Sequence, residues 1–132
     1  MRGIYIHIPF CKQKCYYCDF ISFAKKEELI EQYINALKKE INNTLKPNDK
    51  IDTIYIGGGT PSVIDSKYIR EVLHEIYKII GFDEKREVTI EINPGTVTKE
   101  KLEDYKQVKI NRISSYVCFP SRMQSYELIF EK

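Results

Sequence analysis

Short apolar runs alternate with longer amphipathic segments along the chain. The apolar runs are rich in isoleucine and end at Pro, Gly or Asn, a pattern that predicts strands. The runs span residues 4–8, 53–56 and 88–92, and a fourth strand is expected from Ile113 onward. Because each run is short and apolar, we expect a parallel sheet with both faces covered.

The segments between these runs have the apolar spacing of helices. Residues 25–45 carry Leu, Ile and Tyr at helical intervals, with Lys and Glu on the other faces, and residues 65–80 repeat the pattern. Asp65 or Ser66 suits the start of the second helix, and Gly81 suits its C-terminal cap. Two helices are therefore expected between the first three strands.

A third, shorter helix is expected after Thr98, with Leu102 and Tyr105 turned inward. The complete order is then βαβαβαβ. Strands that alternate with helices predict an α/β fold, in which parallel strands are joined by right-handed crossovers.

Three unusual loops follow the first three predicted strands. They comprise residues 10–20, 57–61 and 91–95. In folds with parallel strands, chemistry collects in the loops at the carboxyl ends of the strands. The three loops are therefore expected to lie on one rim and to form one site.

The first loop contains three of the four cysteines, Cys11, Cys15 and Cys18, in a C-x₃-C-x₂-C spacing. Three thiolates on a short loop can each bind one iron of a cubane cluster and leave the fourth iron for another ligand. Zinc is the main alternative, although structural zinc usually takes four protein ligands. Cys118 lies far along the chain, and His7 is a conceivable fourth ligand in a predicted strand. The spacing favours the cluster and leaves zinc or redox thiols open.

The second loop, Gly57–Pro61, is rich in glycine. Glycines let the backbone approach a ligand closely and adopt a positive φ. The same composition also suits a tight strand-to-helix turn, and neither a Walker A nor a dinucleotide-binding pattern is present. This loop alone leaves both interpretations open.

The third candidate is Glu91, a carboxylate in an apolar strand. Such a group is costly to bury unless it is paired. Glu91 could accept hydrogen bonds from a ribose or an amine, or it could face a helix-borne Lys or Arg. Tyr5, Tyr17 and His7 are first of all candidates for packing, although the two tyrosines could also flank a bound nucleoside.

Composition and charge add limits rather than a function. The chain has 132 residues, enough for one small domain, and a formal net charge of +2, which predicts neither a nucleic-acid nor a membrane-surface partner. No apolar run approaches the roughly 20 residues of a membrane helix. With no signal-peptide pattern at the start of the chain, a cytoplasmic location is expected.

Taken together, these motifs resemble the radical S-adenosylmethionine (SAM) proteins of the oxygen-independent coproporphyrinogen III oxidase group. The resemblance runs from about Ile4 to Ser114 and rests on the combination of motifs. The matching stretches are Tyr5–Cys11, the three-cysteine loop, Gly57–Ser62, Glu91–Gly95 and Asn111–Ser114. The glycine loop by itself is not specific, whereas the set as a whole is.

The resemblance implies the N-terminal part of a partial (βα)₆, TIM-like barrel and a [4Fe–4S] cluster on Cys11, Cys15 and Cys18. The implied SAM contacts are Tyr5, Tyr17, Gly58, Gly59, Thr60 and Glu91. It also implies reductive cleavage of SAM to methionine and a 5′-deoxyadenosyl radical, with an electron donor as partner. In that chemistry the protein supplies binding and orientation.

The residues after the third cysteine distinguish branches of this group. The decarboxylating oxidases carry a further cysteine two positions beyond it, where this chain has Phe20 after Asp19. This difference resembles the HemW, or haem-chaperone, branch. It implies binding of haem, or of a porphyrinogen, and transfer of haem to a receiving protein. A SAM-independent haem-trafficking protein and an inactive fragment are the alternatives to a radical SAM enzyme.

The resemblance ends abruptly after Ser114. We therefore interpret residues 1–114 as the N-terminal part of the radical SAM core and residues 115–132 as a divergent tail, produced by a frameshift or gene-model error. The glycine and the SAM-contacting Gln of the family pattern have no counterpart here. A sheet of four parallel strands would leave an apolar edge open, so we expect self-association.

Overall fold

The computed structural model describes residues 2–10, 23–119 and 122–129, with side chains described for residues 2–10 and 27–115. The strands and helices expected from the apolar pattern are all present. The elements are β1 (Gly3–Ile8), α1 (Phe23–Thr44), β2 (Thr53–Gly58), the 3₁₀ helix η1 (Pro61–Val63), α2 (Ser66–Ile80), β3 (Glu87–Ile92), α3 (Lys99–Gln107), β4 (Arg112–Phe119) and β5 (Arg122–Ile129).

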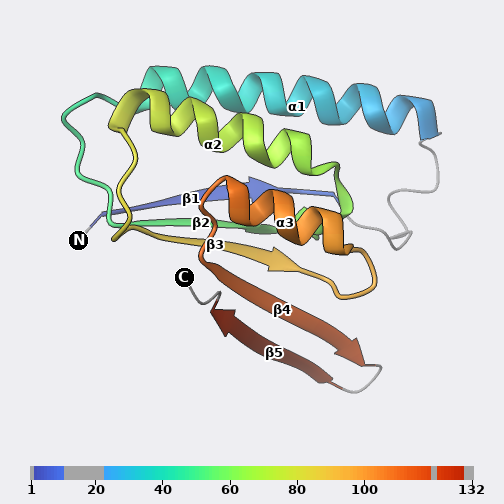
Figure 1. Cartoon of the computed structure of the whole chain (residues 1–132). Coiled ribbons are helices and arrows are strands. Elements are labelled where there is room, and N and C mark those ends of the chain that lie inside the picture. Colours follow the sequence, from blue (N-terminus) through green and yellow to red (C-terminus); the bar gives the residue numbers. More distant parts are fainter. Residues whose placement is uncertain (1, 11–22, 120–121, 130–132) are drawn as a thin grey trace.

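One sheet with the strand order β1-β2-β3-β4-β5 organises the molecule (Figure 1). Strands β1 to β4 are parallel, as predicted for an α/β fold of the barrel type. The sequence did not lead us to expect β5, which pairs with β4 in antiparallel orientation, from Arg112 opposite Ile129 to Phe119 opposite Arg122. The expected open edge at the fourth strand is therefore wrong, because β5 covers it.

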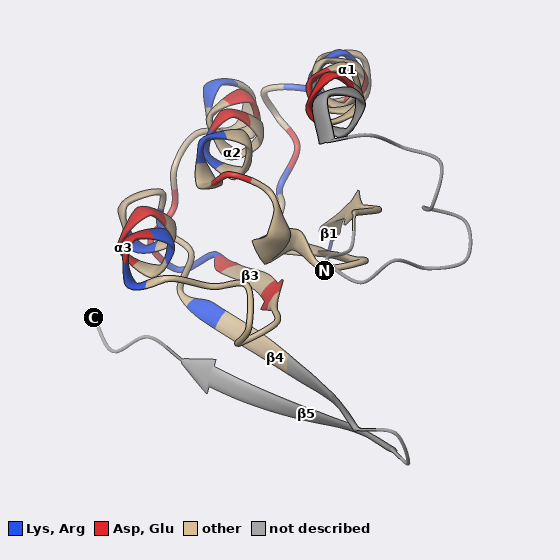
Figure 2. Ribbon diagram, turned by 90° about the vertical axis from the view of Figure 1, so that its right-hand side faces the viewer, with Lys and Arg blue, Asp and Glu red and all other residues tan. Residues whose placement is uncertain are grey.

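All three α-helices lie on one side of the sheet, as Figure 2 shows. The strands place their most buried side chains on this side, including Ile6, Ile8, Ile56 and Ile90, each no more than 2% exposed. The expectation that both faces would be covered is wrong for the described part of the chain. Residues between the buried isoleucines alternate to the opposite face, which carries polar and aromatic groups.

The ends of α2 and α3 are fixed by side-chain and backbone caps. Asp65, rather than Ser66, caps α2, because its carboxylate accepts a hydrogen bond from the Lys67 backbone N–H at 3.0 Å. Gly81 closes the same helix with a φ of 79°. The inward position predicted for Tyr105 on α3 is confirmed, since this side chain is fully buried.

At the amino ends of the strands, a buried arginine ties loops together. Arg86 donates from Nε to the Ile51 carbonyl and from Nη1 to the Gly81 carbonyl, each at 2.9 Å. Asn111 adds hydrogen bonds to the backbone of Arg86 and Val88. This end of the sheet is closed by structural hydrogen bonds, so the carboxyl ends remain the place for a site.

No helix among the described residues has the length and apolarity to cross a membrane.

Tyr77 on α2 makes stability depend on alkaline pH. Its hydroxyl donates to the Val108 carbonyl at 3.0 Å, and burial raises its pKa from 10.0 to about 12. Because the unfolded chain ionises first, the free energy of unfolding should fall from about pH 10 to 12, by at most about 1.4 kcal/mol per pH unit from this group. Urea unfolding over this range should show a shallower fall for Tyr77→Phe. An equal slope in both proteins would contradict the assignment.

Candidate functional site

The carboxyl ends of β1, β2 and β3 bring five of the six predicted SAM contacts onto one rim. Tyr5 lies on β1, Gly58 ends β2, Gly59 and Thr60 follow it, and Glu91 lies near the end of β3. The remaining predicted contact, Tyr17, and the proposed cluster ligands Cys11, Cys15 and Cys18 lie outside the described residues.

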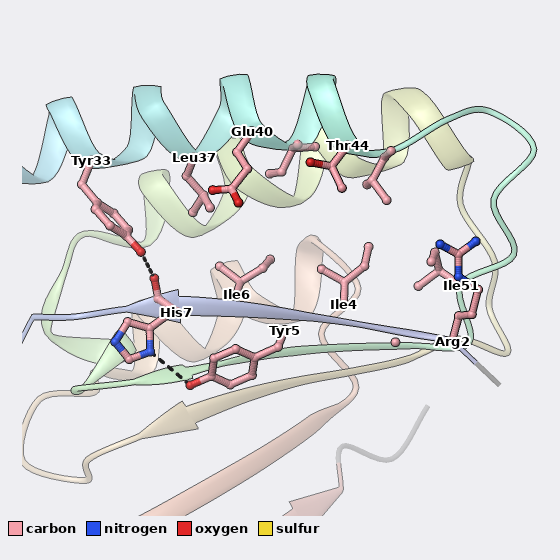
Figure 3. Close-up of a pocket in the computed structure, with 13 residues that line it drawn as sticks. Arg2, Ile4, Tyr5, Ile6, His7, Tyr33, Leu37, Glu40, Thr44 and Ile51 are labelled. Atoms are coloured by element: carbon pink, nitrogen blue, oxygen red, sulfur yellow. Dashed lines mark hydrogen bonds between the residues drawn. The ribbon is translucent and has the colours of Figure 1, made fainter.

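On β1, the side chains of Tyr5 and His7 turn away from α1, whereas Ile4 and Ile6 turn toward it (Figure 3). The Tyr5 hydroxyl lies 3.2 Å from His7 Nδ1. The Tyr5 ring stacks on Tyr55 of β2, with ring centroids 6.0 Å apart and an interplanar angle of 17°. Tyr5 is 59% exposed, so much of its ring remains accessible on the open face of the sheet.

The glycine loop runs close along the end of β1. The backbone N–H of Gly59 donates to the Ile8 carbonyl at 2.9 Å, and that of Thr60 donates to the Phe10 carbonyl at 2.6 Å. Gly58 has a φ of +117°, and a Cβ there would lie 2.8 Å from His7 Nδ1. The loop also leads directly into η1. It is therefore both a tight strand-to-helix turn and a site of close backbone approach, the two interpretations that the sequence left open.

Glu91 is half-buried, and its hydrogen-bond partner comes from the neighbouring strand. The Tyr55 hydroxyl donates to Glu91 Oε1 at 2.7 Å. The alternative of a helix-borne Lys or Arg facing this carboxylate is therefore wrong for the described residues. The sequence motifs did not predict a role for Tyr55. Its position just before the glycine loop, on the same strand face as Gly57, is the feature of the sequence that indicates one.

A second network locks the glycine loop to the loop after β3. The buried Ser62 hydroxyl lies 2.5 Å from the Thr96 hydroxyl and accepts a hydrogen bond from the Asn93 backbone N–H at 3.0 Å. Lys101 Nζ donates to the carbonyls of Ser62, at 2.7 Å, and Thr96, at 3.2 Å. Partial burial lowers the pKa of Lys101. These contacts tie the loop after β2 to the loop after β3, and none of the sequence motifs predicted them.

Tyr33 of α1 fixes the end of β1 just before the cysteine-rich segment. Its hydroxyl donates to the His7 carbonyl (Figure 3). Its ring meets Phe10 edge-on, with centroids 5.7 Å apart. The backbone leading to Cys11 is thereby tied to the helix layer.

Replacement of Tyr33 by phenylalanine should lower the free energy of unfolding by about 0.5–1.5 kcal/mol, because it removes the hydrogen bond to the His7 carbonyl. Tyr68→Phe is the matched control, since the Tyr68 hydroxyl is 3.5 Å from Glu31 Oε1 and makes a weak contact at best. Urea unfolding of both variants measures the difference. Equal losses would show that the Tyr33 hydroxyl has no special part in fixing β1.

A cavity of about 370 Å³ lies between β1 and α1 and extends along β1 from Arg2 to His7 (Figure 3). Aliphatic side chains form much of its lining, with Glu40 and Arg2 as its charged members. Among residues whose side chains are described, no group of three or more His, Cys, Asp or Glu residues is placed to hold a metal ion.

A sheet of parallel strands with a polar rim at its carboxyl ends, in a chain whose sequence carries three clustered cysteines directly after the first strand, defines a class of cofactor-binding α/β proteins. The family model of the radical SAM superfamily matches residues 5–117. The chain therefore belongs to the radical SAM superfamily, as the resemblance of its motifs indicated.

Three relatives show where the chain lies within this superfamily. It is 44% identical to the haem chaperone HemW of Haemophilus influenzae over 119 residues, which are 85% of this chain and 31% of the relative. It is 39% identical to HemW of Escherichia coli, covering 85% of this chain and 30% of the relative, and 35% identical to HemW of Bacillus subtilis, covering 86% and 31%. The chain thus spans about a third of the length of these curated relatives.

A solved structure supports the fold. Coproporphyrinogen III oxidase (HemN) from Escherichia coli, described as a radical SAM enzyme, superposes with a TM-score of 0.72 over 86% of this chain and 27% of the other. The two sequences are 24% identical, so this likeness carries the fold alone. It agrees with the predicted N-terminal part of a TIM-like barrel.

Proposed function

We propose that the chain forms the N-terminal, cofactor-binding part of a radical SAM protein of the haem-chaperone type. The observation that carries the proposal is the shared rim, where β1, β2 and β3 present Tyr5, Gly58 and Glu91, together with the three cysteines that follow β1 in the sequence. In this proposal, residues 1–114 are the working part of the core and residues 115–132 are a divergent tail. The cytoplasmic location expected from the sequence stays a prediction.

Cys11, Cys15 and Cys18 would hold the [4Fe–4S] cluster. Three thiols suit three irons of a cubane and leave one iron for SAM. When bound, such a cluster supplies the electron for reductive cleavage of SAM. The chain's own contribution begins with Tyr33 and the glycine loop, which fix Ile8 and Phe10 and hence the start of the cysteine-rich segment.

SAM would bind across the rim through Tyr5, Tyr17, Gly58, Gly59, Thr60 and Glu91. The described part of this set fits a nucleoside with an amino-acid tail. The Glu91 carboxylate can accept hydrogen bonds from hydroxyl or amine donors. The glycines leave a shallow cradle, since a Cβ at Gly57 would come within 2.8 Å of Glu91 Oε1. The Tyr5 ring offers an exposed aromatic surface beside this cradle.

The names of the relatives extend the proposal to haem. HemW proteins are called haem chaperones, so we propose that the complete protein binds haem and passes it to a receiving protein, with an electron donor as a further partner. A porphyrinogen is the alternative ligand, suggested by the coproporphyrinogen oxidase whose fold is shared. A SAM-independent haem-trafficking protein that retains the cluster, or an inactive fragment, remain the competing functions.

Anaerobic reconstitution with iron and sulfide tests the proposal in two stages. Broad absorbance near 400 nm and about four irons per chain are expected for the cluster. After reduction, formation of 5′-deoxyadenosine from added SAM would separate a radical SAM enzyme from a haem carrier. Stoichiometric zinc without iron would defeat the cluster assignment. A cluster with no SAM binding would favour the SAM-independent function.

A further inference from the structure

Tyr55 contacts side chains of both neighbouring strands on the open face of the sheet. Its hydroxyl donates to Glu91 Oε1 at 2.7 Å, and its ring stacks on Tyr5. Three neighbouring strands are thereby linked by side chains at the level of the proposed SAM site. None of the motifs that pointed to SAM includes Tyr55.

The strand register explains how Tyr55 reaches Glu91. Tyr55 is directly opposite Thr89, and Ile56 is opposite Ile90. Glu91 therefore lies two residues further toward the carboxyl end on the same face. This diagonal separation is within reach of an aromatic side chain. The Tyr55 hydroxyl therefore reaches the carboxylate from a position nearer the amino ends of the strands.

Gly57 supplies the space into which this carboxylate fits. A Cβ at Gly57 would lie 2.8 Å from Glu91 Oε1 and 2.8 Å from Tyr55 Cε1, closer than side chains tolerate. The carboxylate therefore lies directly over the backbone of β2. Among the described residues, Oε1 has the Tyr55 hydroxyl as its partner and Oε2 has none.

Building on the function proposed above, we propose that Tyr55 is a positioning residue for bound SAM. Its hydroxyl holds Glu91 Oε1, so that Oε2 is presented to a hydroxyl or amine donor of SAM. The stack with Tyr5 keeps the Tyr55 ring in place from the other side. Without the hydroxyl, the carboxylate loses its anchor and must be ordered when SAM binds, which weakens affinity.

The test compares SAM affinity among variants of the full chain after anaerobic reconstitution. Tyr55→Phe keeps the ring and removes only the hydroxyl, and should raise the Kd for SAM about fivefold, as expected for one net hydrogen bond. Tyr77→Phe is the matched control, because it also loses a hydroxyl that donates at 3.0 Å, but at Val108, away from the rim. Its Kd should equal that of the unaltered chain.

A double-mutant cycle with Glu91→Gln separates positioning from a general structural role. If Tyr55 acts through Glu91, adding Tyr55→Phe to Glu91→Gln should weaken SAM binding by clearly less than fivefold, since interacting residues are non-additive. Full additivity would overturn the proposal. Iron content and far-UV circular dichroism should be the same in all four proteins.

The outcomes distinguish this proposal from the function on which it rests. If the unaltered chain binds SAM and Tyr55→Phe binds it equally well, the role of Tyr55 is overturned and the proposed function stands. If the unaltered, cluster-loaded chain does not bind SAM, both are overturned. If Tyr55→Phe does not fold, Gly57→Ala decides, since its methyl would displace the Glu91 carboxylate. Unweakened SAM binding by Gly57→Ala would then overturn the proposal.

Discussion

Replacement of Cys15 by alanine should reduce the iron bound after anaerobic reconstitution from about four atoms per chain to a small fraction of one. Three thiolates are the minimum protein ligand set proposed for this cluster, and Cys15 is the middle ligand of the C-x₃-C-x₂-C spacing. With two thiolates remaining, half of the cubane irons would lack protein ligands. The broad absorbance near 400 nm should be lost with the iron.

Cys118→Ala is the matched control for this experiment. Cys118 is the remaining cysteine of the chain and lies in β4, far along the sequence from the other three. If only the clustered thiols bind the metal, Cys118→Ala should retain the full iron content. Equal loss of iron in both variants would show that four thiols share the metal, and would favour a zinc-type site.

The helices and the four parallel strands could be predicted because they follow from local periodicity. The isoleucine-rich run at Ile4–Ile8 alternates with period two, and the buried residues of α2 recur at helical spacing. The same local information placed Asp65 and Gly81 at the ends of α2. The prediction that both sheet faces are covered was wrong. A short apolar run does not show which of its alternating residues will contact polar side chains on neighbouring strands.

The antiparallel strand β5 could not be foreseen for a different reason. β4 and β5 are joined by two residues, Pro120 and Ser121, between the paired Phe119 and Arg122. Short hairpins are usually signalled by Asn-Gly or Asp-Gly, which are absent here. The loss of the family pattern after Ser114 also favoured the interpretation of this segment as a divergent tail rather than as a strand.

The candidate site could also be predicted only in part, for the same reason. Glu91 and the glycine loop could be recognised from the sequence, because a carboxylate within an apolar strand and three successive glycines are unusual sequence patterns. Tyr55 and Ser62 act through contacts with Glu91 and Thr96, more than 30 residues away in the sequence. Such contacts depend on strand register, which a single sequence does not specify.

The strand register also explains why one position of the glycine loop, residue 58, requires glycine. Gly58 pairs with Ile8 at the end of β1, where the His7 ring lies against it. A side chain there would have to displace either this ring or the backbone of β1. The proposed SAM contacts on both strands would move with it. Gly58 is therefore the position of the rim at which one methyl group should do most harm.

Gly58→Ala should destabilise the fold and abolish SAM binding together. A φ of +117° costs an alanine about 1–3 kcal/mol. The new Cβ would lie 2.8 Å from His7 Nδ1 and 2.9 Å from the Ile8 backbone nitrogen, and this overpacking adds about 1–3 kcal/mol. Urea unfolding measures the sum, and equilibrium dialysis of the reconstituted chain measures SAM binding.

Gly81→Ala isolates the steric part of this effect. Gly81 also has a positive φ, of +79°, but a Cβ there meets nothing within 4 Å. It should carry the backbone cost of about 1–3 kcal/mol without the overpacking, and it should bind SAM normally because it caps α2 at the opposite end of the sheet. Equal destabilisation of the two variants, with SAM bound by both, would show that Gly58 serves the turn alone. A larger loss in Gly58→Ala, accompanied by loss of SAM, would show that the absent side chain shapes the binding rim.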